Sequence, residues 1–338
     1  HAQPAGALVL PVWKTADSGV TAGQPDRFDA VMMMDYDPAQ PGWPGIVHYA
    51  HRPLEYTVSS YAEGTGLVPA ACEAPLVVTV HDLAFVRYPD RFSRHGVRTM
   101  TRSIDVIRRR AALVLCSSSA TMDDLERAGI GRDRLRYVPL GVEVAEVGPA
   151  EIDRVRRVHG LPERFVLFVG TLEPRKNLPR LAAAVARLDD PLPLVVVGAD
   201  GWGGVHDAMT APVADGGATA DVRFVGSLSD ADLAACYAAA TVFAYPSEWE
   251  GFGLPVAEAL AHGIPVVTSR ATSMEEVAGG AAVLVDPCDV DDIARGLSEA
   301  LDDADRDERV AAGRRRAAEL SWSATTDATV AAYREAAR

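Results

Sequence analysis

The sequence predicts an α/β protein of two domains, each built on a parallel β-sheet with helices on both faces. The chain has 338 residues, more than one ordinary hydrophobic core accommodates. Along it, short apolar runs alternate with helical patterns, and uninterrupted apolar runs are typical of strands buried on both faces of a parallel sheet. Such sheets bind ligands at the carboxyl ends of their strands, so we expect functional residues in the loops that follow these runs.

The composition is that of a globular protein, with 48% hydrophobic and 24% charged residues. No apolar run reaches the roughly 18 residues that span a bilayer, and no secretory leader is recognisable. The four cysteines, Cys72, Cys116, Cys236 and Cys288, form no CxxC pair, so neither a zinc knuckle nor a disulfide framework is indicated. A formal net charge of -14 argues against nonspecific nucleic-acid binding. We therefore expect a reduced, cytoplasmic protein.

The first domain is expected to span residues 1–147. Its strands are predicted at 76–80, 113–116 and 135–139, with a basic helix at 93–110 between the first two. Serines 117–119 offer helix caps, Asp123 and Asp124 are expected in the first turn of that helix, and Gly129 ends it. A stretch rich in glycine and proline then leads to a boundary near residue 147.

The second domain is expected to span residues 148–320. Its strands are predicted at 165–169, 194–197, 222–225, 242–245, 264–268 and 283–285. The closing segment from residue 290 indicates three helices, with breaks near Asp305 and at Ser321 and Trp322. We expect the last helix, 321–338, to cross back to the first domain.

Two adjacent cations follow the strand FVLFVG, in the turn GTLEPRKN. The chain contains only two lysines, Lys14 and Lys176, so a lysine beside Arg175 is unusual here. An arginine offers a planar fork and a lysine a compact charge, and together they could bind a diphosphate without a metal. The alternative is a pair of solvated charges at a helix start, where cations oppose the helix dipole and a structural helix gains nothing from them.

A second loop follows the strand TVFAYPS, in the run EWEGFGLPVAEALAHG. Gly251 and Gly253 allow close approach of a ligand, and Pro255 suits the first turn of a helix that begins near Leu254. The free amides around Phe252 to Leu254 would face an anion. The loop is therefore predicted to bind phosphate or sugar.

Two carboxylates belong to the same run. Glu258 lies one turn inside the expected helix, where it could accept hydrogen bonds from a vicinal diol such as ribose. Glu250 precedes the helix and could meet sugar hydroxyls. For either one alone, a surface position or a complement to the helix dipole is the structural alternative.

These motifs resemble GT-B glycosyltransferases of family GT4. FVGTLEPRKN, RFVGSLSDADL and YPSEWEGFGLPVAEALAHGIPVV occur in that order, and VTVHDLAF and RLRYVPLGV are similar to the first domain of those enzymes. The resemblance covers residues 76–334. It implies two Rossmann-like domains whose parallel sheets face each other across a cleft. It also implies retaining transfer of a hexose, with a lean towards mannose, from a nucleotide diphosphate sugar to a glycan, lipid-linked or small-molecule acceptor.

The resemblance also implies residue roles. Arg175 and Lys176 would bind the donor diphosphate, Glu258 the ribose and Glu250 the donor sugar. His81, at the end of a strand, would face the transferred sugar, although a lone histidine there is more often structural. The full donor-binding set is Gly170, Arg175, Lys176, Gly226, Leu228, Glu250, Gly251, Phe252, Gly253, Leu254 and Glu258.

The mechanism implied is front-face displacement without a covalent nucleophile, a metal or another cofactor. Arg175, Lys176 and the amides near Gly253 would stabilise the charge that builds on the leaving diphosphate. The run Asp35, Tyr36, Asp37 imitates a metal-binding DxD, but its surroundings indicate a strand end and a loop.

The sequence departs from the family at its start. The chain begins with His1, and its first 30 residues lack the expected strand and glycine-rich turn, so we expect either missing native residues or a reduced first βα unit. The arginine-rich run 91–110 is either a solvated helix face or a contact for anionic lipid at the inner face of the membrane. A nucleotide-sugar epimerase of the same fold and a non-catalytic donor-binding module remain alternatives, whereas no GxGxxG supports a dehydrogenase.

Overall fold

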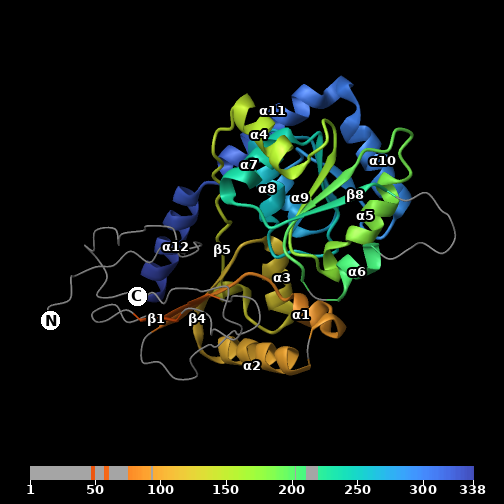
Figure 1. Cartoon of the computed structure of the whole chain (residues 1–338). Coiled ribbons are helices and arrows are strands. Elements are labelled where there is room, and N and C mark those ends of the chain that lie inside the picture. Colours follow the sequence, from red (N-terminus) through yellow and green to blue (C-terminus); the bar gives the residue numbers. More distant parts are fainter. Residues whose placement is uncertain (1–46, 50–56, 61–74, 93, 202, 211–219) are drawn as a thin grey trace. The chain divides into compact units, whose positions relative to one another are not determined.

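A computed structural model describes residues 47–49, 57–60, 75–92, 94–201, 203–210 and 220–338 (Figure 1). The chain forms two compact units, and Leu140–Trp322 is the second. The first unit combines the chain up to Pro139 with Ser323–Arg338. The change of unit falls at Leu140, earlier than the boundary expected near residue 147. Leu140 already packs in the core of the second unit, and the Val142 amide donates to the Leu320 carbonyl oxygen at 2.8 Å.

The first unit holds a five-stranded sheet in the order β1-β2-β3-β4-β5. Its strands are β1 (Val47–Tyr49), β2 (Thr57–Ser60), β3 (Leu76–Val80), β4 (Ala111–Cys116) and β5 (Leu135–Tyr137). The last four are parallel, and β1 runs antiparallel to β2, which departs from the fully parallel sheet predicted. The sequence did not indicate β1 and β2, because their sequences, VHY and TVSS, contain polar residues and form no continuous apolar run.

Between β3 and β5, the described chain of the first unit forms three α-helices and two 3₁₀ turns. They are α1 (Ala84–Arg87), a turn at Pro89–Arg91, α2 (Arg94–Arg110), α3 (Ser119–Arg127) and a turn at Arg132–Arg134. The serine cap predicted for α3 is present, since the Ser118 hydroxyl accepts from the Thr121 amide at 3.1 Å. The placement of Asp123 and Asp124 in the first turn was wrong. Helix α3 already begins at Ser119, so both acids lie beyond its first turn, which holds no acid.

The last helix, α12 (Trp322–Ala336), packs on the sheet of the first unit. Its Ala332 and Tyr333 form a small buried cluster with residues of β3 and β4 and with Val138. The Thr325 hydroxyl donates to the Pro139 carbonyl oxygen at 2.7 Å. This helix is therefore part of the core of the first unit.

The second unit holds a six-stranded sheet in the order β11-β10-β9-β6-β7-β8, and every pairing is parallel. The strands are β6 (Val166–Val169), β7 (Leu194–Val197), β8 (Val222–Gly226), β9 (Val242–Tyr245), β10 (Val266–Ser269) and β11 (Val283–Val285). Each one lies at an apolar run from which a strand was predicted. The α/β class and the Rossmann-like sheets are thus confirmed.

Helices cover both faces of this sheet (Figure 1). They are α4 (Pro149–His159), α5 (Leu178–Val185), α6 (Val205–Thr210), α7 (Asp230–Ala239), α8 (Leu254–His262), α9 (Ser273–Ala278), α10 (Val290–Leu301) and α11 (Arg306–Glu319). Helix α5 packs with α10, while α4 packs with α7 and α8 with α11. The three closing helices α10, α11 and α12 are those predicted. None of the helices in the described ranges is long and apolar enough to cross a bilayer.

The strand order defines where a ligand site should form. From β6 the chain winds outwards through β7 to β8, and from β9 it winds the other way through β10 to β11. The direction reverses between β6 and β9, which are hydrogen-bonded neighbours. In open α/β sheets the loops at the carboxyl ends of such a strand pair form the ligand crevice.

Candidate active site

The two loops that the sequence singled out lie at this reversal point and contact each other. One follows β6 and carries Arg175, and the other follows β9. The Glu248 amide and the Ser247 hydroxyl both donate to the Arg175 carbonyl oxygen, at 2.8 and 3.1 Å. The Asn177 side-chain amide donates to the Pro246 carbonyl oxygen at 3.0 Å. Two motifs far apart in the sequence therefore form one site.

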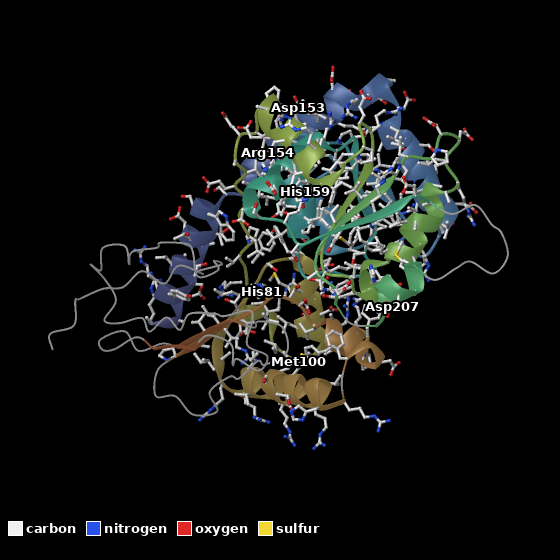
Figure 2. The ribbon with its side chains drawn as sticks, in the orientation of Figure 1. His81, Met100, Asp153, Arg154, His159 and Asp207 are labelled. Carbon is white, nitrogen blue, oxygen red and sulfur yellow. The ribbon has the colours of Figure 1, made fainter. Side chains whose placement is uncertain are left out.

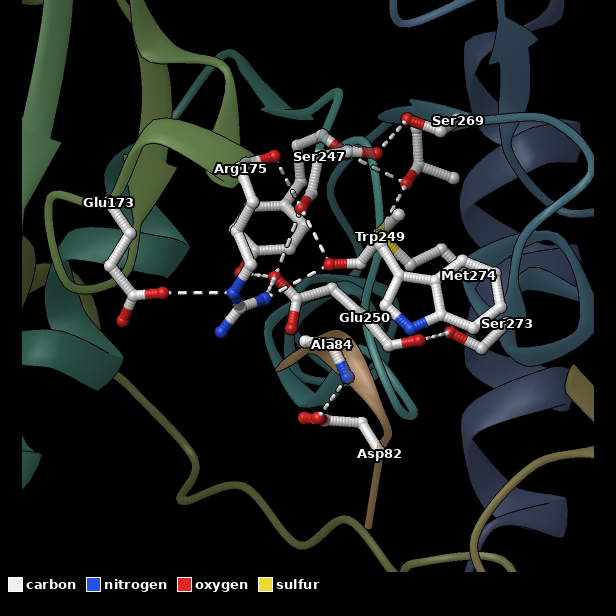
Figure 3. A network of polar contacts seen from close by, with 12 residues as sticks. Asp82, Ala84, Glu173, Arg175, Ser247, Trp249, Glu250, Ser269, Ser273 and Met274 are labelled. Carbon is white, nitrogen blue, oxygen red and sulfur yellow. Dashed lines mark hydrogen bonds and ion pairs between the residues drawn. The ribbon is translucent and has the colours of Figure 1, made fainter. Parts of the chain in front are cut away.

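Arg175 is buried between two carboxylates (Figure 3). Its Nε lies 2.9 Å from Glu173 Oε2, and its Nη1 lies 2.7 Å from Glu250 Oε1 and donates to the Trp249 carbonyl oxygen at 3.0 Å. Burial alone would lower the pKa of Arg175, but the charges of Glu250 and Glu173 outweigh it and raise the pKa. The sequence predicted a cation open to phosphate, whereas two nitrogens of this guanidinium already bind protein carboxylates.

Glu250 has one oxygen fixed by protein donors. Its Oε1 contacts Arg175 Nη1 and accepts from the hydroxyls of Tyr245 at 2.9 Å and Ser247 at 3.1 Å. Its Oε2 has no hydrogen-bond partner among the described residues. Burial would raise the pKa of Glu250, but the charges of Arg175 and Lys176 and these donors hold it below its usual value. Glu250 is therefore ionised at neutral pH, and one of its oxygens has no donor among the described residues.

Lys176 is the cation of the pair without a fixed counter-ion. The residue is 8% exposed, and no carboxylate lies within ion-pair distance of its ammonium in the part of the chain that the structure describes. The ammonium occupies space that glycine leaves open, because a Cβ at Gly170 would lie 3.0 Å from Lys176 Nζ. A buried charge without an internal partner is costly unless a ligand satisfies it.

The glycine-rich loop leads directly into α8. Gly253 caps this helix with φ +106°, and a Cβ there would lie 2.7 Å from Met274 Cγ, so no other residue fits without strain. No side chain caps the helix, and the amides of Phe252, Gly253 and Leu254 donate to no acceptor within the described ranges. Free amides at the start of a helix are suited to binding an anion.

Glu258 lies one turn into α8, as predicted. Its Oε2 accepts from the Tyr237 hydroxyl at 2.8 Å, and its Oε1 has no partner among the residues described. Burial raises the pKa of Glu258, the Tyr237 hydrogen bond lowers it, and the charge of Asp230 adds to the rise. Like Glu250, this carboxylate presents one fixed oxygen and one open oxygen.

Three other predicted site residues, Gly226, Leu228 and His81, belong to other elements of the structure. Gly226 and Leu228 follow the edge strand β8, and within the described ranges no hydrogen bond joins them to Arg175 or Glu250. His81 follows β3 in the first unit, where its carbonyl oxygen accepts from the Thr121 hydroxyl at 3.0 Å (Figure 2). Burial lowers the pKa of His81 to about 4, so its ring is uncharged at neutral pH.

Some expectations fall where the structure gives no description. The run from Asp35 to Asp37 and the expected loss of a first βα unit lie outside the described residues. In the part that is described, no group of three His, Cys, Asp or Glu side chains is arranged to hold a metal ion.

Sequence reasoning missed four residues that hold the site together: Glu173, Tyr237, Tyr245 and Ser247. Glu173 carried a local signal, since it lies two positions before Arg175 in the same turn. Tyr245 ends β9, and Ser247 follows it in the second loop. Tyr237 carried none, because it contacts Glu258 from another helix.

Two family models match the chain. The model for glycosyl transferases group 1 matches residues 151–317, and that for the glycosyl transferase 4-like domain matches residues 23–141. O-antigen chain mannosyltransferase B of Escherichia coli is 35% identical over 272 residues, which are 76% of this chain and 70% of that protein. The MMP alpha-(1->4)-mannosyltransferase of Mycolicibacterium hassiacum is 34% identical over 294 residues, which are 81% of this chain and 68% of that protein.

Solved structures agree on the fold. HepE from Anabaena, in complex with UDP and glucose, matches with a TM-score of 0.64 at 23% identity, over 76% of this chain and 71% of that one. Sucrose-phosphate synthase from Thermosynechococcus elongatus matches with a TM-score of 0.63 at 25% identity, over 78% of this chain and 68% of that one. Together with the site geometry and the curated relatives, these matches show that the chain belongs to family GT4 of the glycosyltransferases and has the GT-B fold.

Proposed function

We propose that this glycosyltransferase moves a hexose, with mannose as the first candidate, from a nucleotide diphosphate sugar to an acceptor hydroxyl with retention of configuration and without a metal. The observation that carries the proposal is a buried lysine, Lys176, which makes no ion pair among the described residues and lies in the loop that contacts the one leading to the free amides of α8. The names of the two relatives, both mannosyltransferases, support mannose, and the UDP and glucose bound to HepE support a nucleotide-sugar donor.

Each side chain has a place in this proposal. Lys176 and the α8 amides receive the diphosphate, while Arg175 keeps Glu250 ionised and fixed. The open oxygen of Glu250 accepts from a hydroxyl of the donor sugar, and that of Glu258 from the ribose diol. From the resemblance, we assign His81 to the transferred sugar and the turn of Gly226 and Leu228 to the nucleotide base.

The chemistry follows from where charge develops. As the bond between sugar C1 and the phosphate oxygen lengthens, negative charge grows on the diphosphate, and a fixed ammonium and fixed amides stabilise that charge without reorganising. The acceptor oxygen attacks C1 from the face that the diphosphate leaves, and a phosphate oxygen takes the acceptor proton. Configuration is retained, and no protein nucleophile is required.

The donor is testable without knowing the acceptor. Among GDP, UDP and ADP sugars, the true donor at 100 times its Kd should stabilise the protein by about 2.7 kcal/mol in a thermal unfolding assay. Transfer from that donor should persist in EDTA and give a product with the anomeric configuration of the donor, as read by NMR.

Three outcomes of this assay would contradict the proposal. Isomerisation of the donor alone would indicate an epimerase. A donor that binds but is neither transferred nor hydrolysed would indicate a binding module. Loss of transfer in EDTA would exclude the metal-independent route.

We further propose that α2 contacts anionic lipid at the inner face of the membrane. Arg94, Arg98, Arg102 and Arg109 are exposed and recur at the spacing of one helix face. None of them has a carboxylate partner in the part of the chain that is described. The opposite face of α2 is buried in the core of the first unit, and Figure 2 shows nitrogen-tipped side chains pointing away from it.

Reversing Arg94, Arg98 and Arg102 to Glu should abolish flotation with vesicles of phosphatidylcholine and phosphatidylglycerol. Each basic residue near an anionic surface contributes about 1 kcal/mol, so the triple reversal should weaken binding at least about 100-fold. A matched triple reversal of exposed arginines in the second unit, Arg157, Arg164 and Arg187, should float like the wild type. Wild-type protein that does not float, or floats equally with phosphatidylcholine alone, would contradict the lipid contact.

A further inference from the structure

Glu258 depends on a single protein donor. The Tyr237 hydroxyl, on α7, donates to Glu258 Oε2 at 2.8 Å, and no other hydrogen bond or ion pair reaches this carboxylate within the described ranges. The Tyr237 ring cannot swing away, because it is 1% exposed and confined on two sides. It stacks on His262 with centroids 5.2 Å apart and planes at 12°, and it lies 5.6 Å from the Phe243 ring.

Glu250 provides an internal comparison. It too has one oxygen held by a buried tyrosine, Tyr245, but the same oxygen also contacts Arg175 and Ser247. Loss of one hydroxyl would leave Glu250 with two partners. The equivalent loss at Tyr237 would leave Glu258 with none among the described residues.

We propose that Tyr237, held flat against His262, is the positioning residue that aims the open oxygen of Glu258 and thereby sets recognition of the vicinal diol of a nucleoside diphosphate. The hydroxyl fixes the carboxylate through Oε2 and leaves Oε1 to accept from the ligand. Tyr237 does not touch the ligand itself. This inference rests on the proposed function, because it assigns a nucleoside diphosphate to the same site.

The ionisation of Glu258 provides an independent readout. Burial raises the pKa of this carboxyl, the Tyr237 hydrogen bond opposes the rise, and Asp230 on α7 adds to it. His262 carries no charge at neutral pH, since burial lowers its pKa to about 4, and Arg314 of α11 packs at the far end of α8 beside Gly263. Removing the Tyr237 hydroxyl should therefore raise the pKa of Glu258 further. The acidic limb of ligand binding should then move to higher pH.

The test compares Tyr237→Phe with Tyr245→Phe. Both substitutions delete a buried hydroxyl bonded to a carboxylate and keep the ring. The probes are whichever of GDP, UDP and ADP the wild type binds, and the 2′,3′-dideoxy form of the same diphosphate. Tyr237→Phe should weaken binding of the ribose form on the order of tenfold, as loss of a charged hydrogen bond does, and leave the dideoxy form nearly unchanged. Tyr245→Phe should have a smaller effect on both.

Two further measurements separate positioning from general damage. In a Glu258→Ala background, Tyr237→Phe should cause no additional loss, because a residue that acts only through Glu258 is not additive with its removal. The KM for the donor should rise more than kcat falls. If Tyr237→Phe does not fold, His262→Leu, which removes the stacked ring but keeps the hydrogen-bonding pair, should reduce the preference for the ribose form.

The outcomes distinguish the inference from its basis. A wild type that binds none of the three diphosphates overturns the proposed function and this inference with it. A wild type that prefers the ribose form, together with a Tyr237→Phe variant of equal preference, overturns the inference alone. Equal effects of the Tyr237 and Tyr245 substitutions would also overturn it.

Discussion

Replacing Lys176 with Ala is expected to lower turnover on the order of 100-fold, as the loss of one donor at a developing charge often does. Lys176 is a buried cation that makes no ion pair among the described residues, so we expect its ammonium to be available to the leaving diphosphate. Its removal breaks no described ion pair but takes away one of the charges that lower the pKa of Glu250, so the free energy of unfolding should fall less than on loss of Arg175. Steady-state kinetics and urea unfolding measure the two effects separately.

Arg187→Ala is the matched control for this substitution. Arg187 follows α5, the helix that begins just after Lys176, but its side chain is 51% exposed and pairs with Asp291, which is 83% exposed. Its loss should leave turnover near the wild-type value, because exposed ion pairs contribute little. Turnover unchanged by Lys176→Ala, or lowered equally by both substitutions, would count against the diphosphate assignment.

Arg175→Met, unlike Lys176→Ala, is expected to have its larger effect on the free energy of unfolding. The substitution removes the cation buried between Glu173 and Glu250 and leaves two carboxylates without their counter-charge. Breaking a buried ion pair from one side typically costs about 3 to 5 kcal/mol. Urea unfolding at neutral pH should show a loss of this size, and transfer should fall because Glu250 is no longer fixed.

The pH dependence of this loss has a definite sign. In the wild type, the pKa of Glu250 is depressed below its unfolded value, so its stabilisation is present above that value and is lost as the pH falls through the folded pKa. Without Arg175, burial dominates and raises the pKa of Glu250, which favours the protonated folded state. The stability gap between the two proteins should therefore narrow from neutral towards acidic pH.

Arg180→Met is the control for the arginine substitution. Arg180 donates to Glu248 and to Asn177 in the same region, but its side chain is 42% exposed. Its loss should cost less than about 1 kcal/mol and show no comparable narrowing with pH. A gap for Arg175→Met that stays constant over this range would contradict the assignment of Glu250 as its ionised partner.

The strands of the second unit could be predicted because a strand buried on both faces leaves a continuous apolar run. The runs that became β6 and β9 each lead into a loop whose composition indicated a ligand, and this located Arg175, Lys176, Glu250 and Gly253. Strands β1 and β2 could not be found this way, since VHY and TVSS include polar residues and leave no continuous apolar run.

The contacts that tune the site could not be predicted, because they depend on strand order. Arg175 donates to the Trp249 carbonyl 74 positions away, and it does so because β6 pairs with β9 and not with a strand nearer in sequence. Tyr237 donates to Glu258 across 21 positions, from a neighbouring helix. No periodicity or local spacing encodes either relation. The sequence therefore indicated the charged side chains of the two loops more readily than the residues that hold them.

Helix α12 affects the order in which the molecule matures on the ribosome. The buried cluster of Val77, Leu113, Leu115 and Val138 is completed by Ala332 and Tyr333, which are translated after the whole of Leu140–Trp322. Among the described residues, the larger core of the first unit lies within residues 76–135 and includes no residue of α12. Only this second cluster therefore departs from the usual succession, in which the amino-terminal part of a chain folds first. The unit whose translation begins earlier therefore completes this cluster late, and the nascent chain holds that unfinished surface until α12 emerges.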